Sequence, residues 1–414
     1  MKTLYTPRQI TFILGCCMSA YFSCFQTSAV SINPLTHIPE EETEQVRKKT
    51  YEEAIQLLPN RRYSILARIG KVAIQPIALA GLFQGYFSCL YEIFDVKMPL
   101  AKSKELLEDM GAEIIKIPTG PNAEIFAMYF RADVFKSRLE TLYQKWHREL
   151  SSLPRLQGFL EADLEAEDFM QLLRIPQASL ENCSEYKKGV VRCIGANNLF
   201  EANPQAILHD LFRGMDHLAF NYRGLNESSG QPDFEGTLVD AYCATRYMLD
   251  RLNCRPEDLM IVGTSLGGAP ALFTASKIHG LDVVVDRSFA RLSLVKIHRL
   301  VQPFFSFFAE SFFPYPNEEW ITEVTGRVCI IQAKQDVLIQ PFHAERLLHA
   351  YVEAKLGPNA SFKEKEDLIQ HSFHLAEGGH FGKLGGDPFD AWFSVESDQQ
   401  KYSRFIQGKP ISEE

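Results

Sequence analysis

The chain has 414 residues, a formal net charge of −9, 46% hydrophobic residues and 23% charged residues. These proportions are typical of a globular protein with one large domain and an appendage, or with two domains. The negative charge and the lack of any long lysine and arginine run argue against a nucleic-acid-binding protein. The nine cysteines form no C-x-x-C pair and no zinc-type spacing, so they predict no metal site and favour a reducing, intracellular setting.

The N-terminus carries an uncharged, apolar stretch over residues 10–25, which follows Lys2 and Arg8. This layout is that of a signal peptide, and residues 27–29 provide a cleavage site. Two alternatives are an uncleaved hydrophobic helix that docks or anchors, and a lipoprotein signal ending at Cys16. The sequence favours the uncleaved helix.

A second uncharged stretch covers residues 72–91 and has the length of a bilayer span. Polar residues such as Gln75 and Gln84 favour a buried or surface-lying helix instead. Membrane association through residues 9–26 and 72–91 is thus an open alternative. A membrane-associated or intracellular location is favoured over export.

The order of predicted elements divides the chain into four parts. After the hydrophobic segment comes a helical extension, beginning with a charged, solvated helix, then the main domain and a short tail. The main domain carries a helical insertion and a cap. The predicted bounds are 1–35 for the hydrophobic segment, 36–100 for the extension, 101–405 for the main domain, 406–414 for the tail, 131–188 for the insertion and 288–326 for the cap.

Strands and helices alternate through the main domain, which opens with a hairpin of strands. Short apolar runs rich in valine and isoleucine indicate strands buried on both faces. Their alternation with helices predicts an α/β fold with a mostly parallel central sheet and helices on both faces. Ligands of such sheets bind at the carboxyl ends of the strands. The predicted strands are 113–118, 124–130, 189–194, 216–222, 258–262, 281–286 and 327–332.

The most informative motif is G-x-S-x-G at residues 263–267. It follows the apolar strand 258–262 and precedes a small-residue helix. In this context the motif is a nucleophile elbow, a sharp turn that holds the serine hydroxyl clear of the sheet. The sequence therefore predicts Ser265 as a nucleophile.

A serine nucleophile needs a base to accept its proton and an acid to orient that base. In proteins with this elbow, the acid and then the histidine follow the serine along the chain. Asp336, just past a late buried strand, is the predicted acid, and His380, in a glycine-rich loop, is the predicted base. The alternative acid is Asp286, although Arg287 beside it suggests a simple salt bridge. The alternative bases, His371 and His374, alternate along a predicted strand over 368–375.

The oxyanion of an acyl-transfer intermediate needs two backbone N–H groups aimed at it. The residue after the nucleophile, Leu266, supplies one. The second is expected in the loop that begins at Gly195, from Ala196, with Asn197 as the alternative. The simplest alternative is that Gly195 only ends a strand.

Residues from about 112 to 381 resemble the α/β-hydrolase superfamily, in its serine esterase- and peptidase-like branch. The resemblance rests on the elbow (263–268), the loops 221–224 and 228–230, and the histidine loop 379–381. More narrowly, the N-terminal extension and these loops resemble the chlamydial CHLPS protein family, which has no assigned biochemical role. The resemblance implies an α/β-hydrolase fold with an N-terminal extension and a cap. Two departures are Ile194-Gly195 in place of the usual His-Gly and the long insertion 131–188.

The predicted cap contains an aromatic-rich run over residues 301–316. Aromatic side chains over the mouth of a site would favour an apolar acyl or lipid-like substrate. The same run equally fits a helix packed on the core by its phenylalanine face. The sequence does not separate a carboxylesterase from a thioesterase, lipase or peptidase.

Two functions follow from these features. The first is a serine hydrolase that cleaves an ester, thioester or similar acyl bond through an acyl-enzyme. The alternative is a catalytically silent hydrolase-like scaffold that acts by protein or membrane interaction. Neither function requires a cofactor or a metal.

Overall fold

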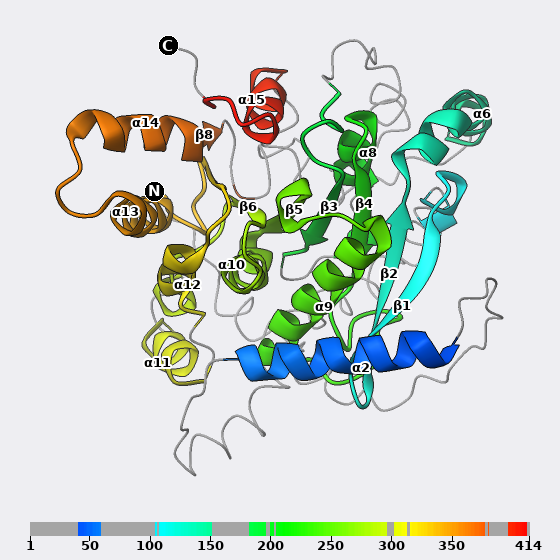
Figure 1. Cartoon of the computed structure of the whole chain (residues 1–414), viewed down its shortest axis with the longest axis horizontal. Helices are drawn as coiled ribbons and strands as arrows, with labels where there is room; N and C mark the ends of the chain where they lie inside the picture. Colours follow the sequence, from blue (N-terminus) through cyan, green and yellow to red (C-terminus); the bar gives the residue numbers. More distant parts are fainter. Residues whose placement is uncertain are drawn as a thin grey trace, which may run out of the picture.

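An eight-stranded sheet forms the centre of the computed structural model, in the order β1-β2-β4-β3-β5-β6-β7-β8 (Figure 1). β1 pairs with β2, and β2 with β4, in antiparallel fashion, whereas all other pairs are parallel. The predicted α/β fold with a mostly parallel sheet is therefore confirmed. The strands are β1 (Glu113–Gly120), β2 (Ala123–Phe130), β3 (Gly189–Cys193), β4 (Asp216–Phe220), β5 (Leu259–Thr264), β6 (Asp282–Asp286), β7 (Val328–Ala333) and β8 (Phe373–Ala376).

The structure describes only part of the chain. The hydrophobic stretches 9–26 and 72–91, for which membrane association was an open alternative, lie outside the described residues, as do residues 151–181 of the predicted insertion. The described residues are 40–58, 104–105, 107–150, 182–195, 199–202, 204–295, 302–312, 315–376, 380 and 396–411.

Helices cover both faces of the sheet (Figure 1). α9 and α10 pack on the face to which Ile261 and Val283 contribute, and α15 lies against the face of Met260 and Val262. Burial on both faces explains the uninterrupted apolar run of β5, where each large side chain contributes roughly 1.5–3 kcal/mol. The helices are α2 (Glu40–Leu57), α6 (Ala132–Leu150), α8 (Pro204–Phe212), α9 (Phe234–Leu252), α10 (Gly268–Lys277), α11 (Gln302–Phe312), α12 (Asn317–Glu323), α13 (Pro341–Leu356), α14 (Phe362–Ser372) and α15 (Glu396–Ile406).

Helix α2 of the N-terminal extension packs on the main domain, near α9 and β1 (Figure 1). Ala54 is fully buried, and the Glu53 carboxylate accepts a hydrogen bond of 2.7 Å from the hydroxyl of Tyr242 in α9. The Tyr51 ring lies close to the β1–β2 turn at Gly120. The charged composition predicted a solvated helix, but one face of it is docked.

Residues 368–375 differ from the strand predicted for them. Helix α14 continues to Ser372, and only Phe373–Ala376 form a strand, β8. The helix begins with a capping box, in which Ser361 Oγ accepts the N–H of Glu364 and the Glu364 carboxylate accepts the N–H of Ser361. This reciprocal cap stabilises a helix through a stretch whose apolar residues alone resemble a strand.

The C-terminal residues also pack on the sheet. Ile406 and Ile411, which the sequence placed in a tail, are both buried in the cluster beneath α15. Arg327 holds this end of the chain, since its guanidinium donates to the carbonyl oxygens of Phe405 and Ile406. The described part of the predicted tail, residues 406–411, thus packs on the main domain.

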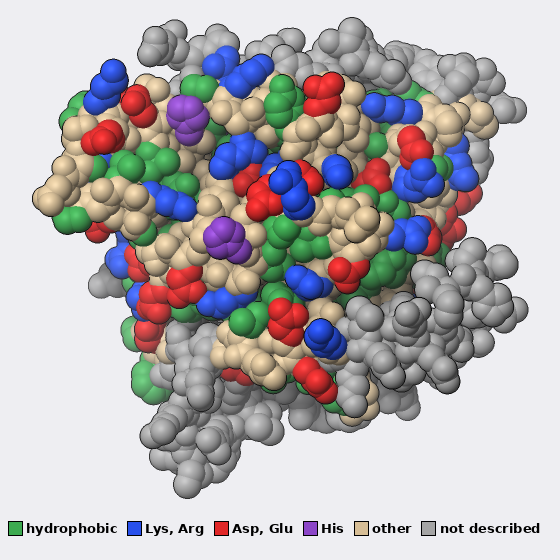
Figure 2. Space-filling model, in the orientation of Figure 1, with side chains coloured by type: hydrophobic (Ala, Val, Ile, Leu, Met, Phe, Trp, Pro, Cys, Tyr) green, Lys and Arg blue, Asp and Glu red, His purple; other side chains and the backbone are tan. Residues whose placement is uncertain are grey.

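Acidic and basic side chains intermingle on the face shown in Figure 2, with no large area of one sign. Among the described residues, no helix combines the length and the apolar character needed to cross a bilayer.

Candidate active site

Ser265 occupies a strained turn between β5 and α10. Its φ angle is +54°, in the left-handed region that non-glycine residues rarely adopt. A short 3₁₀ turn, Ser265–Gly267, precedes α10. The serine therefore stands at the N-terminal end of a helix and at the carboxyl edge of the sheet, as an elbow requires.

Two glycines allow this turn to lie against the neighbouring backbone. A Cβ at Gly263 would lie 2.3 Å from the carbonyl oxygen of Gly267. A Cβ at Gly267 would lie 2.2 Å from the carbonyl oxygen of Cys193 at the end of β3. No side chain fits at these distances, so the glycines of the motif are a steric requirement of the fold.

The side chains of Ser265, His380 and Asp336 form a continuous hydrogen-bonded chain. Ser265 Oγ lies 3.0 Å from His380 Nε2, and His380 Nδ1 lies 2.8 Å from Asp336 Oδ2. The other carboxylate oxygen of Asp336 accepts the N–H groups of Leu338 and Ile339 at 2.9 and 2.8 Å. Because a carboxylate only accepts, Nδ1 carries the proton in the neutral ring, and Nε2 can accept one from the serine.

These three residues come from separate elements at the same edge of the sheet. Ser265 follows β5, Asp336 follows β7 and His380 follows β8 in the sequence, and β5 to β8 run parallel. The structure thus brings together the nucleophile, acid and base that the sequence named. Their catalytic roles stay predictions.

The alternative acid, Asp286, engages other partners. Its two oxygens accept from Arg287 Nε and Nη2 at 2.8 and 2.7 Å, and Oδ2 also accepts from the Thr264 hydroxyl at 3.3 Å. The geometry therefore favours Asp336 as the residue that orients His380.

The alternative bases lie on different elements. His371 is in the last turn of α14, where its Nδ1 lies 2.6 Å from the carbonyl oxygen of Asp367 in the same helix. His374 is a buried residue of β8. The hydrogen bond of Ser265 goes to His380.

On the oxyanion side, Leu266 is the residue after Ser265 in the 3₁₀ turn. Ala196 and Asn197 lie outside the described residues. Gly195, directly before them, is packed against the nucleophile, since a Cβ there would lie 3.3 Å from Ser265 Cβ and 3.9 Å from Oγ. Gly195 therefore lies alongside the serine, two residues past the end of β3.

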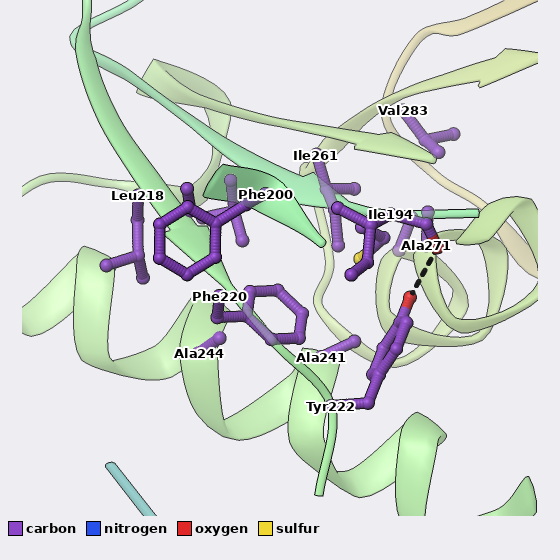
Figure 3. Close-up of a cluster of buried hydrophobic side chains, with 14 of the residues drawn as sticks. Ile194, Phe200, Leu218, Phe220, Tyr222, Ala241, Ala244, Ile261, Ala271 and Val283 are labelled. Atoms are coloured by element: carbon purple, nitrogen blue, oxygen red, sulfur yellow. Dashed lines mark hydrogen bonds between the residues drawn. The ribbon is translucent and has the colours of Figure 1, made fainter. Parts of the chain in front are cut away.

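Buried polar residues hold the chain on both sides of this loop, and the sequence did not identify them. The Tyr222 hydroxyl donates to the carbonyl oxygen of Ile194 at 3.3 Å (Figure 3). The Asn221 side chain accepts the N–H of Phe200 at 3.2 Å and donates to both oxygens of the Glu201 carboxylate. Burial raises the pKa of Glu201. The only sequence signal was the loop 221–224 that carried the family resemblance.

No group of three or more His, Cys, Asp or Glu side chains that could hold a metal ion occurs in the part of the chain that the structure describes.

Comparisons with known proteins give partial matches in sequence. The uncharacterised membrane protein YNL320W of Saccharomyces cerevisiae is 29% identical over 143 residues, which are 32% of this chain and 48% of that protein. The uncharacterised protein YfhR of Escherichia coli is 29% identical over 147 residues, 34% of this chain and 50% of that protein. The chain thus spans about half the length of the curated relatives it matches. No family model matches the chain, so the resemblance to the chlamydial CHLPS family stays a prediction.

Solved structures that are similar in fold include α/β-hydrolases. The esterase Pf2001 of Pyrococcus furiosus has a TM-score of 0.44 and 13% identity, covering 72% of this chain and 92% of the esterase. An α/β-hydrolase from Vibrio vulnificus has a TM-score of 0.43 and 12% identity, covering 92% of this chain and 98% of that protein. At these values neither likeness says anything about activity.

Proposed function

We propose that the protein is a serine hydrolase that cleaves an ester, thioester or similar acyl bond. The observation that carries the proposal is the chain of two hydrogen bonds from Ser265 Oγ through the His380 ring to Asp336, at 3.0 and 2.8 Å. Three side chains from separate elements have no structural need to meet in this order at the edge of a sheet. Acyl transfer by a serine nucleophile with a histidine base and an orienting carboxylate uses this order.

In the proposed reaction, His380 Nε2 takes the proton from the Ser265 hydroxyl as its oxygen attacks the acyl carbon. Asp336 keeps the imidazole in the required tautomer and stabilises its positive charge. The N–H of Leu266 donates to the developing oxyanion, and Ala196 or Asn197 is expected to supply the second donor. His380 then protonates the leaving group, and a water molecule, activated by the same ring, hydrolyses the acyl-enzyme.

An apolar acyl group is the proposed substrate class, as a small molecule or a lipid. Support comes from the aromatic-rich helix α11, where the Phe307 side chain is 64% exposed. A solvent-exposed phenylalanine on this helix offers apolar surface outside the core, although Ala309 of the same helix is buried.

Labelling with a fluorophosphonate tests the proposal. We expect the wild type to be labelled and Ser265→Ala to remain unlabelled. Ser276→Ala is the matched control, because Ser276 lies on α10 with its hydroxyl bonded to the carbonyl oxygen of Phe273, and it should label like the wild type. A folded wild type that takes no label would contradict the proposal and favour the silent scaffold. A positive result leads to a series of aryl esters of increasing chain length.

A further inference from the structure

The last residue of β6 and the two that follow it, 286–288, contact both the nucleophile turn and the histidine. Asp286 accepts from the Thr264 hydroxyl, directly before the nucleophile, and Ser288 Oγ donates to the carbonyl oxygen of Ser265 at 2.6 Å. Between them, Arg287 Nη1 donates to the carbonyl oxygen of His380 at 3.1 Å. The 286–288 segment is thus bonded to the backbone of both the serine and its base.

Arg287 is held in one conformation. Its guanidinium forms two parallel hydrogen bonds to the Asp286 carboxylate. The backbone N–H of Arg287 donates to the carbonyl oxygen of Ile331 in β7 at 2.9 Å. The residue is 3% exposed and has a φ angle of +47°. Left-handed backbone at a non-glycine residue is costly and persists only where the surroundings impose it. A planar guanidinium fixed by a bidentate carboxylate directs its remaining donors at defined points, which a lysine could not do.

The pairing with Asp286 also matters for charge. A lone guanidinium beside His380 would oppose the positive charge that the ring must take up during acyl transfer. The Asp286 carboxylate, at 2.7 Å from Nη2, neutralises that guanidinium. The pair can therefore hold the histidine backbone without working against imidazolium formation.

We propose that Arg287 is a positioning residue for the general base, and that Asp286 serves to orient it. This inference rests on the proposed function. Arg287 contacts the main chain of His380 at its carbonyl oxygen, so it acts on where the ring stands rather than on the reacting atoms. A misplacement of about 1 Å at a catalytic group lowers rates by roughly 10²-fold.

The test compares Arg287→Met with the wild type on an activated aryl ester. We expect kcat to fall by roughly 10- to 100-fold with KM unchanged. Arg287→Lys, which keeps the charge and can make one bond to the carbonyl oxygen, should recover part of the loss. In a His380→Ala background, Arg287→Met should cost less than about twofold, because a residue that acts through His380 has no effect once the ring is absent.

Arg327→Met is the matched control. Arg327 pairs with Asp282 at the opposite end of β6 and likewise donates to backbone carbonyl oxygens, those of Phe405 and Ile406. Thermal unfolding of every variant separates stability from rate. We expect Arg327→Met to lose stability but to keep the wild-type kcat per folded molecule.

The outcomes separate the two proposals. An inactive, unlabelled wild type overturns both the function and this inference. If the wild type is active, two results would overturn this inference alone. One is a folded Arg287→Met variant that keeps the wild-type kcat, and the other is a loss of kcat that persists in the His380→Ala background. If Arg287→Met fails to fold, Arg287→Lys provides the test. Wild-type kcat in Arg287→Lys, or an equal loss of kcat with and without His380, would overturn the positioning role of Arg287.

Discussion

Replacing Asp336 with asparagine keeps the shape of the side chain and reverses the hydrogen bonding at one atom. In the structure, Oδ1 accepts the N–H groups of Leu338 and Ile339, and Oδ2 faces His380 Nδ1 at 2.8 Å. The asparagine oxygen must stay with the two backbone donors, because an NH₂ group there would leave them unpaired. The NH₂ group therefore faces the histidine.

This orientation selects the wrong tautomer of His380. An amide nitrogen only donates, so Nδ1 must accept and the ring proton moves to Nε2. Nε2 then cannot accept the proton of Ser265. The same change in a serine protease lowers kcat by about 10⁴-fold, which corresponds to about 5.4 kcal/mol of barrier. The fold should survive, since both backbone bonds to residue 336 are kept.

The assay is kcat on an activated aryl ester, together with the rate of fluorophosphonate labelling. Asp286→Asn is the comparison, because Asp286 is the other acid at this edge and pairs with Arg287 instead. We expect Asp286→Asn to lose only about tenfold, through weaker positioning. If Asp336→Asn stayed within tenfold of the wild type while Asp286→Asn lost a thousandfold, the acid would be Asp286 and the reasoning would be refuted.

Three further predictions concern packing and pH. Gly195→Ala would place a Cβ 3.3 Å from Ser265 Cβ, so we expect a folded protein with roughly tenfold lower kcat on the aryl ester. Gly267→Ala would place a Cβ 2.2 Å from the Cys193 carbonyl oxygen, and we expect a loss of more than about 3 kcal/mol in urea unfolding; wild-type stability would contradict the elbow geometry. Burial lowers the pKa of His209 from 6.5 to about 3, so the unfolded state binds more protons in between and stability falls as the pH drops through that window. His209→Gln should therefore reduce the wild-type stability loss between pH 7 and pH 5 by about 2 kcal/mol, and an unchanged loss would show that His209 is not buried as a neutral ring.

The strands were predictable because both faces of the sheet are covered. A strand such as β5, with Met260 facing one layer and Ile261 the other, must be apolar at every position, and that pattern is visible in one sequence. The exception was 368–375, where apolar residues are spaced ambiguously. The capping box at Ser361 and Glu364 was the signal for a helix, but it lies well before the stretch it governs.

The candidate site was predictable where a motif forces a local shape. The elbow glycines and the order of serine, acid and histidine follow from short patterns. The contact of Arg287 with the His380 carbonyl oxygen joins residues 93 positions apart. Because the acceptor is a backbone atom, no pattern of side-chain types in the sequence predicts the contact. The hydrogen bond from the Tyr222 hydroxyl to the Ile194 carbonyl oxygen could not be predicted for the same reason.

β6 carries an aspartate–arginine pair at each end, and the two pairs differ in what they stabilise. At the amino end, Arg327 pairs with Asp282 and holds the C-terminal helix. At the carboxyl end, Arg287 pairs with Asp286, but its backbone is in the left-handed region, as is that of Ser265. Backbone strain in two segments that contact each other lowers the stability of the folded state. A segment that served only to pack the core would have no need of this strain. Among the described residues, the other non-glycine residues with positive φ are Asn226 and Asn253, and asparagine adopts this region more readily than arginine or serine. The strain at Arg287 and Ser265 therefore argues that this pair serves the geometry of the site.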